Sequence, residues 1–464
     1  MVISGSVYSM GAWQSRLRDD LGLSTAQVSS IGAATFGGSV VAVLGGRAFD
    51  ILGPRTACLL GGVMHTAGYL LIAAALAFAD VLPEAARIGL PAIGCALAGY
   101  SSVSLLDNVV CMSCSLSFPN DRAAIVGYLK AVLAAGAGLW ALLWVHVFAP
   151  NFGLISYVLF VAAVAFCGTA LALLGVRVLP EGPDRRKFDS ADGRRLGLAI
   201  GFIVLLALFC VATSFCYSSK MIGPTAGLGA VGVAISLLPL TLLLGTSDDL
   251  PAELKEPMLP TAPQLEKKLA VFGGGVGANQ NLALIFESAR SPASSGLGVA
   301  LFALASTVSR VSVGVLSDRY SHVLNRFGWL CVVAAIATVG QLLLSPMIAG
   351  FILCGTFCLG LSFGSFFTLV VPIVNEMYGR KDFGAIMGAA LSCQALASFL
   401  ISVELLPTVY RIAAHGLGVC YGAECFLDSF LALAALNALG FGIAIWLARR
   451  NANGMPIDRY VESK

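Results

Sequence analysis

Long apolar stretches, each close to the length that crosses a bilayer, follow one another along this chain with short polar loops between them. A membrane-spanning helix needs about 20 predominantly apolar residues. Such stretches lie at 26–46, 56–79, 88–114, 123–148, 154–176, 197–217, 225–245, 297–317, 328–345, 347–372, 383–406 and 425–448, with shorter ones at 1–13 and 269–286. The pattern predicts an all-α integral membrane protein with about fourteen spans.

Two longer polar loops divide the predicted helices into two halves with an inserted segment between them. The second loop is rich in acidic residues and proline, so we expect a tether that cannot fold, with an acidic docking surface as the alternative. We predict an N-terminal six-helix bundle at 1–176, a basic loop at 177–196, an inserted helix pair at 197–245, a linker at 246–268, a second six-helix bundle at 269–448 and a tail at 449–464.

The composition agrees with a membrane protein and argues against several other classes. Apolar residues make up 58% of the chain and charged residues 11%, whereas a soluble domain carries about 25% charged residues. The net charge of +3 is too small to indicate a nucleic-acid partner. With the N-terminus in the cytoplasm, most Lys and Arg fall in cytoplasmic loops, so both termini are predicted to be cytoplasmic. Plasma and vacuolar membranes fit this pattern equally well.

Two sequence echoes relate the halves to each other. Gly46 and Asp50 recur 268 residues later as Gly314 and Asp318. The segment DRAAIVG at 121–127 recurs 261 residues later as DFGAIMG. Repeated helical bundles in a membrane are typical of transporters.

The repeated Gly–Asp turns are candidates for a gate. Glycine allows close approach of helices, and an Asp at a helix end can cap a helix N-terminus and pair with Arg across the gap between halves. Contacts of this kind form in one transport state and break in the other. A static loop cap is the alternative. The candidate gating residues are Gly46, Asp50, Gly53, Arg55, Gly314, Asp318 and Arg319.

A few charged residues are predicted to lie deep in the membrane. Arg310 precedes Asp318 by eight residues, which places it ~12 Å along the helix from the loop. Such a cation needs a purpose or a partner. Lys130 is a second deep cation and Asp107 a deep acid. The cations can bind an anionic solute or form a structural ion pair with Asp107, and the sequence leaves both open.

The excess of deep cations favours an anionic solute, and polar neighbours extend the candidate set. The predicted solute-binding residues are Arg310, Lys130, Asn281, Asp107 and Asn108. His65 and His146 could relay protons, but a hydrogen bond to a neighbouring carbonyl is the favoured interpretation. Cys420 and Cys425 fall in the last outer loop, where a disulfide is chemically permitted. No metal or cofactor site is predicted, and the lack of a Gly-x-x-x-x-Gly-Lys-Ser/Thr loop argues against ATP-driven pumping.

The motifs resemble a known family. Gly46, Asp50, Gly53 and Arg55 match the signature loop of the major facilitator superfamily, although Ile51 replaces the usual basic residue that the second copy has as Arg319. FDILGPR, FPNDRAAIVGYLKA, EMYGRKDFGAIMG and CYGAECF are similar to its nodulin-like branch, which is related to oxalate/formate and monocarboxylate transporters. The resemblance implies a twelve-helix core with an inserted helix pair and membrane transport. The first helix of each half is shorter than the family pattern.

The favoured function is secondary transport of a small organic solute, an anion such as a carboxylate, by alternating access. The expected partners are this solute and the lipid bilayer, with protons as a candidate coupling ion and no nucleic acid. The alternatives are a membrane receptor or scaffold that keeps the fold without transport, and a truncated transporter. No arrangement typical of an enzyme site is present in the sequence.

Overall fold

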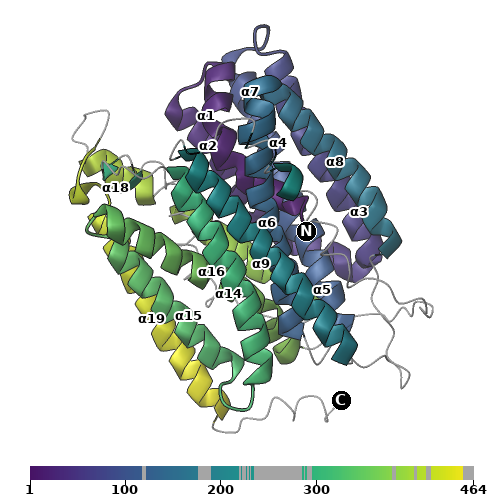
Figure 1. Cartoon of the computed structure of the whole chain (residues 1–464), viewed down its shortest axis with the longest axis vertical. Coiled ribbons are helices and arrows are strands. Elements are labelled where there is room, and N and C mark those ends of the chain that lie inside the picture. The colour runs from purple at the N-terminus through teal and green to yellow at the C-terminus, as the bar shows by residue number, and fades with distance from the viewer. Residues whose placement is uncertain are drawn as a thin grey trace.

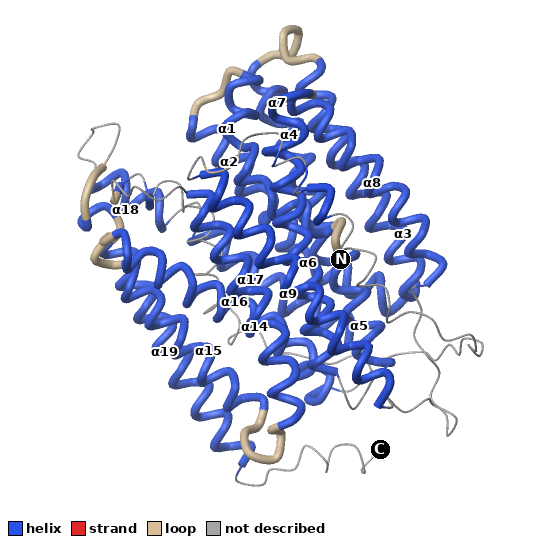
Figure 2. The backbone as a smooth tube through the Cα atoms, in the orientation of Figure 1, coloured by secondary structure: helices blue, strands red, loops and turns tan. Residues whose placement is uncertain are grey.

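Helices form almost the whole of the described structure, and no strand occurs in that part of the chain (Figure 2). The computed structural model describes residues 1–117, 122–175, 190–218, 295–378, 383–401, 405–413 and 420–452, with short pieces within 221–234 and 285–289. The first half contains η1 (Ser4–Ser9), α1 (Met10–Leu21), α2 (Thr25–Gly37), η2 (Gly38–Val41), α3 (Ala42–Ala77), α4 (Glu84–Tyr100), η3 (Ser101–Asp107), α5 (Asn108–Ser117), α6 (Arg122–Leu143), η4 (Trp144–Phe148), α7 (Ala149–Asn151) and α8 (Gly153–Gly175).

The inserted segment and the second half follow. They contain α9 (Ser190–Ser218), α14 (Ser295–Arg319), α15 (Arg326–Leu344), α16 (Ala349–Tyr378), α17 (Phe383–Leu400), α18 (Leu406–Ala413), η8 (Ala423–Cys425) and α19 (Leu427–Ala452). Within the described residues, nine helical segments are long and apolar enough to cross a membrane. The predicted spans 225–245 and 269–286 lie almost entirely outside those residues, so the count of fourteen stays a prediction.

Two boundaries differ from the prediction. The first helix does not end at 13 but continues to Leu21, because Leu17 and Leu21 are buried four residues apart, and Gly22 ends it with φ 63°. The predicted spans 26–46 and 56–79 are joined without a loop, because α3 is interrupted only at Gly53, where φ is 79° and ψ is 169°. Glycine adopts this backbone conformation without a steric penalty.

The two halves lie side by side, the first in purple and blue and the second in green and yellow (Figure 1). Between the halves, α6 packs against α14, and α3 packs against α17. One apolar core joins them, since Phe49 and Val126 of the first half and Phe366 and Met387 of the second belong to the same cluster. The junction is therefore packed by apolar side chains from both halves.

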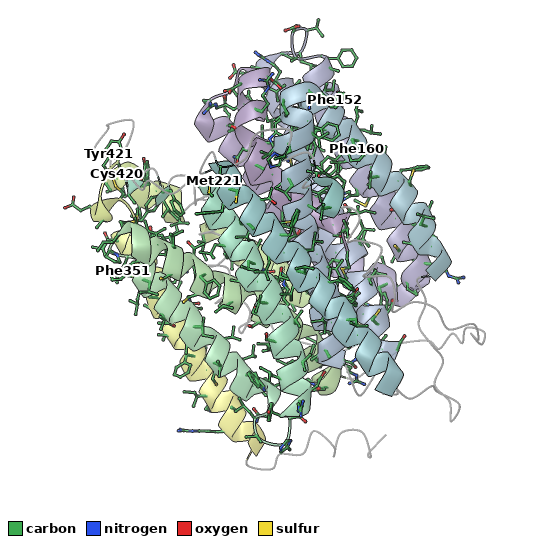
Figure 3. The ribbon with its side chains drawn as sticks, viewed as in Figure 1. Phe152, Phe160, Met221, Phe351, Cys420 and Tyr421 are labelled. Carbon is green, nitrogen blue, oxygen red and sulfur yellow. A yellow bond between two sulfur atoms is a disulfide. The ribbon has the colours of Figure 1, made fainter. Side chains whose placement is uncertain are left out.

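Helix α9 bridges this junction, because it packs against both α6 and α14 (Figure 1). Its buried face recurs at three- and four-residue spacing: Leu196, Ala199, Ile203, Leu206 and Cys210. Gly138 of α6 faces Cys210 closely enough that an added Cβ would lie 3.5 Å from its Sγ. The opposite face of α9 is exposed, as are the phenyl rings of Phe152, Phe160 and Phe351 on the outside of the molecule (Figure 3). Such an apolar surface suits contact with lipid.

Candidate solute site and gate

Each Gly–Asp turn contacts the start of a helix in the opposite half. The Asp50 carboxylate accepts hydrogen bonds from the backbone N–H groups of Gly384 and Ala385, at 2.9 and 2.7 Å, in the first turn of α17. The Asp318 carboxylate accepts one from Ala124, at 2.8 Å, in the first turn of α6. The first N–H groups of a helix lack partners within it and carry partial positive charge, so a carboxylate stabilises them. Both caps therefore hold the halves together at one end of the molecule, called the motif end below.

Glycine makes these crossings possible. A Cβ on Gly46 would overlap the carbonyl oxygen of Gly384, and a Cβ on Gly314 would lie only 2.5 Å from the carbonyl oxygen of Ala123. Real Cβ atoms do not approach other atoms this closely, so any larger residue would force the helices apart. Gly46 and Gly314 are thus required by the closed motif end.

The remaining candidate gate residues lie around these caps. Gly53 forms the break in α3, and Arg55 and Arg319 are exposed at the motif end. We expected an arginine to pair with the motif aspartate across the gap. For Asp318 this is wrong, because its arginine partner is Arg326 of the same half, at 2.5 Å, and its contact across the gap is a backbone N–H.

Arg326 was not predicted as a site residue, although it stands at the start of α15, eight positions after Asp318. Its guanidinium also donates to Ser317 Oγ at 2.6 Å and to Glu376 Oε1 at 3.2 Å. The ends of α14 and α16 and the start of α15 therefore meet at one side chain. A planar fork with several donors is suited to this role, because it can hold two carboxylates at once. Arg326 therefore holds the Asp318 carboxylate in position for its hydrogen bond to α6.

The deep charges lie further along the same crossing. Lys130 of α6 forms an ion pair with Asp107 of η3, and their side chains are only 2% and 6% exposed. Arg310 of α14 donates to the backbone carbonyl oxygen of Lys130 across the junction. The structure therefore brings together three of the five predicted solute-binding residues. It also pairs Asp107 with Lys130, so Arg310 has no acidic partner among the described residues.

The other two predicted residues are Asn108 and Asn281. Asn108 is fully buried next to Asp107, and its side-chain amide has no hydrogen-bond partner in the described part of the chain. A buried amide without partners is costly, which marks the position as suited to a ligand. Asn281 lies outside the described residues.

Aromatic rings of α16 line the two cations. The Arg310 guanidinium lies 5.7 Å from the centre of the Phe363 ring, and the Lys130 ammonium lies 5.6 Å from that of Phe367. These two rings contact each other edge to face at 4.8 Å. Sequence reasoning missed them because phenylalanine in an apolar helix carries no signal that separates it from ordinary core packing.

Further hydrogen bonds between the halves lie along the same part of the helices. Asn375 Nδ2 of α16 donates to Ser115 Oγ of α5 at 3.1 Å, and the backbone N–H of Val43 donates to Ser392 Oγ at 3.1 Å. All the described hydrogen bonds between the halves fall between the level of the deep charges and the Gly–Asp turns. The halves are thus joined by polar contacts at the motif end.

His65 belongs to a separate buried network in the first half. Its Nε2 and Nδ1 atoms lie 3.1 and 3.0 Å from the hydroxyls of Ser6 and Ser101, and Tyr69 donates to Ser6. A contact of His65 with the backbone of Ala98 agrees with the favoured interpretation, and the two hydroxyls are further partners that were not predicted. The Ser101 hydroxyl donates in turn to the Ala98 carbonyl, so a neutral imidazole with its proton on Nδ1 satisfies every member of the chain. His146 is buried in η4.

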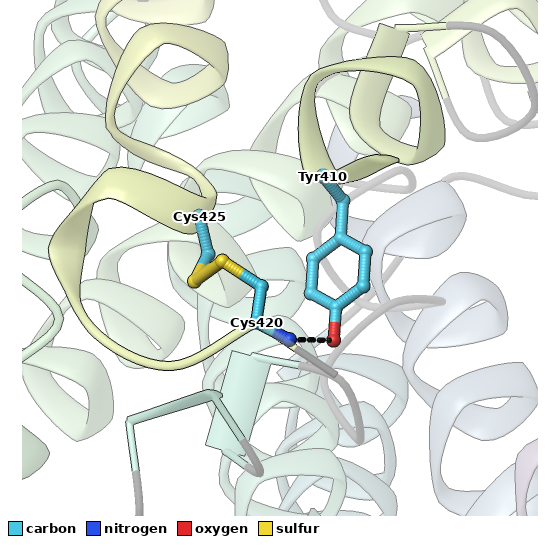
Figure 4. Close-up of a disulfide and its surroundings, with 3 residues drawn as sticks. All are labelled: Tyr410, Cys420 and Cys425. Atoms are coloured by element: carbon cyan, nitrogen blue, oxygen red, sulfur yellow. Dashed lines mark hydrogen bonds between the residues drawn. A yellow bond between two sulfur atoms is a disulfide. The ribbon is translucent and has the colours of Figure 1, made fainter. Parts of the chain in front are cut away.

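Cys420 and Cys425 form a disulfide with a Cα–Cα distance of 5.8 Å (Figure 4). The Tyr410 hydroxyl of α18 accepts a hydrogen bond from the backbone N–H of Cys420 at 3.0 Å, as Figure 4 shows. Both cysteines share an apolar cluster with Leu344, at the end of α15 away from Arg326. The disulfide therefore lies at the end of the second half opposite the motif end.

The sequence of the first half and the inserted segment identifies the family of this chain. Residues 1–244 match the family model described as Nodulin-like, which is more than half of the chain. The chain belongs to the nodulin-like family. The nodulin-like chain is also 32% identical over 196 residues to a probable transporter, MCH1, of Yarrowia lipolytica. That match covers 39% of this chain and 40% of the relative, so it spans less than half of either protein.

Solved structures show the fold of this nodulin-like protein. It is similar to the proton:xylose symporter XylE, with a TM-score of 0.59, 15% identity, and coverage of 96% of this chain and 93% of that one. The human organic anion transporter MFSD10 gives a TM-score of 0.56 at 15% identity, with coverage of 96% and 97%. The nodulin-like chain is therefore a multi-pass membrane protein with the major facilitator fold.

Proposed function

We propose that this protein is a secondary transporter that moves a small organic anion by alternating access. The observation that carries the proposal is Arg310, a cation that is 3% exposed and has no acidic partner among the described residues. An unpaired buried charge is costly, so such a position favours an anionic ligand. Arg310 also lies at the junction of the halves, where alternating-access transporters bind their solutes.

The arrangement of the halves supports the alternating-access part. The polar contacts between them lie toward the motif end, so this state is closed there. Rocking of the halves would break the caps of Asp50 and Asp318 and open the motif end. The gating role of Gly46, Asp50, Gly314 and Asp318 is part of this proposal, with Arg326 added as the residue that positions Asp318.

The disulfide supports an orientation in the membrane. Disulfides persist on the extracytoplasmic or lumenal side of a membrane. With Cys420 and Cys425 on that side, the motif end faces the cytoplasm, as the distribution of basic residues also predicts. Both a plasma membrane and a vacuolar membrane offer such a side. The division into two six-helix bundles, an inserted helix pair and two cytoplasmic loops is retained as part of the same proposal.

Protons are the candidate coupling ion, and Asp107 is the candidate carrier. Protonation of its carboxylate would release Lys130 and change the charge beside Arg310. The similar fold of a proton:xylose symporter supports this role. Asp107→Asn should then make uptake insensitive to an imposed pH gradient, as measured in proteoliposomes with and without that gradient.

Uptake by the purified protein in proteoliposomes tests the transport proposal. Arg310→Ala should lower uptake of organic acids at least about tenfold, and Arg310→Lys should fail nearly as badly, because an ammonium cannot reproduce the planar fork. Arg16→Lys is the matched control, since Arg16 is 59% exposed. Full uptake by Arg310→Ala would remove the basis of the proposal. Thermal stabilisation by an acid without any flux would indicate the receptor alternative instead.

A further inference from the structure

Phe363 faces the interior of the protein yet is not fully buried. On α16, Phe351 is 47% exposed and Phe357 is 36% exposed. Leu361, four residues after Phe357, lies on the same outer face of the helix. Phe363 follows Leu361 by two positions, a rotation of about 200° around a helix. It therefore points away from that face, toward the interior of the helix bundle.

Phe363 is the centre of a group of rings, called the aromatic shelf here. Phe302 of α14 and Phe367 of α16 complete it, with ring centres 5.4 and 4.8 Å from that of Phe363. These two outer members are buried, at 6% each, so only the central residue of the shelf is partly exposed. A partly exposed ring held between two buried ones is a rigid surface on which another ring can pack.

A charged donor stands directly beside this surface. One terminal nitrogen of Arg310 binds the Lys130 carbonyl oxygen, but its Nε has no hydrogen-bond partner among the described residues. The guanidinium lies 5.7 Å from the Phe363 ring centre. A single molecule could thus accept a hydrogen bond from Arg310 and cover the open face of Phe363.

The charges near the shelf fix the charge of that molecule. Asp107 neutralises Lys130 in a buried ion pair, which leaves Arg310 as the one side-chain cation of the described cluster without an acidic partner. A ligand with one negative charge would balance it. A second negative charge would have to be buried without a partner or separate Lys130 from Asp107, and both cost free energy.

We propose that the solute is a singly charged aromatic acid, with its carboxylate on Arg310 and its ring on Phe363. This inference rests on the proposed function and specifies the chemical class of its solute. The aromatic shelf selects for the ring and Arg310 selects for the charge.

The test compares molecules that differ in one property at a time. Apparent affinities from thermal stabilisation of the purified protein, and inhibition of uptake in proteoliposomes, are measured with benzoate, cyclohexanecarboxylate, acetate, benzamide and terephthalate. Benzoate should bind about 2- to 12-fold more tightly than cyclohexanecarboxylate, because a ring pair adds to the effect of apolar area alone. Benzamide and the dianion terephthalate should each bind at least about tenfold more weakly than benzoate.

Phe363→Leu should remove the preference for benzoate over cyclohexanecarboxylate and leave acetate unchanged. Phe357→Leu is the matched control, because it makes the same change on the same helix at an exposed position. Equal binding of benzoate and cyclohexanecarboxylate by the unmodified protein would overturn the inference, as would tight binding of terephthalate. The unmodified protein decides the matter even where Phe363→Leu does not fold. Failure of every acid to bind would instead contradict the proposed function itself.

Discussion

The two crossings between the halves share one backbone arrangement and differ in chemistry. At the first, Gly388 of α17 packs on the carbonyl oxygen of Ala42; at the second, Gly127 of α6 packs on that of Arg310. These positions are related by the same offsets as the sequence echoes, 268 and 261 residues. The repeat therefore supplies two copies of one contact. The residue equivalent to Ala42 in the second copy is Arg310, so only the second copy carries a cation.

The same comparison applies to Lys130. Its equivalent in α17 is Leu391, which is 2% exposed and packs in the core shared by both halves. The α3–α17 crossing is thus apolar where the α6–α14 crossing holds Lys130, Asp107 and Arg310. A helix crossing does not need these charges to form, so their presence on one side only supports the proposed solute site.

The largest expected effect comes from making the charged crossing resemble the apolar one. Lys130→Leu leaves Asp107 buried and without its partner, which should lower the free energy of unfolding by ~3–5 kcal/mol. Adding Asp107→Asn should recover most of that loss, because neither substituted position then carries a charge. Unfolding in detergent with increasing denaturant measures both. Equal stability of the single and double variants would show that the ion pair is not a structural unit.

A second set of changes tests whether the two crossings are equivalent as gates. Gly46→Ala and Gly314→Ala should each force the helices apart and destabilise the closed motif end by ~1–3 kcal/mol. Gly197→Ala in α9 is the control, since a Cβ there meets nothing within 4 Å. Labelling of cysteines introduced at the motif end should increase in both gate variants. An increase in only one would show that the crossings are unequal gates.

A smaller effect is expected from the caps. Asp50→Asn and Asp318→Asn should each shift the balance between open and closed states by ~1 kcal/mol, several-fold in population. Asp318→Asn also loses the ion pair with Arg326. The same labelling reports the shift. Unchanged labelling in both variants would reduce the turns to static caps.

The smallest effect is expected at the edge of the Arg326 cluster. Glu376 is 40% exposed, and solvated ion pairs contribute only ~0.2–1 kcal/mol. Glu376→Gln should therefore change motif-end labelling little, whereas Arg326→Gln should approach the effect of Asp318→Asn. Equal effects from the two variants would mean that Arg326 acts mainly through Glu376 and not through Asp318.

The sequence predicted the architecture better than the contacts. Long apolar stretches identify membrane helices because lipid imposes a length on each one, so α8, α15 and α19 lie close to their predicted positions. Both sequence echoes were visible in the sequence. The sequence did not show that Asp50, from the first echo, caps helix α17, which begins in the second echo and lies in the opposite half. That fact depends on how the halves dock, which no local pattern encodes.

The candidate site shows the same limit. Lys130, Asp107 and Arg310 stood out because charge is costly in an apolar helix, but which cation pairs with Asp107 depends on the rotation of three helices. Arg326 looked like any basic loop residue, and Phe363 like any core residue. Their roles emerge only from neighbours distant in sequence, such as Asp318 and Phe302.

The position of α9 has a consequence for the energy of opening. A helix packed on both α6 and α14 must lose contact with one of them when they separate. Its buried face, from Leu196 to Cys210, would then contact lipid tails that are as apolar as the protein surface it leaves. Association of helices within a bilayer lacks the hydrophobic driving force that operates in water, so this exchange costs only packing. Helix α9 can therefore move along the junction at little cost in free energy. The free energy that opposes opening then comes mainly from the polar contacts at the motif end.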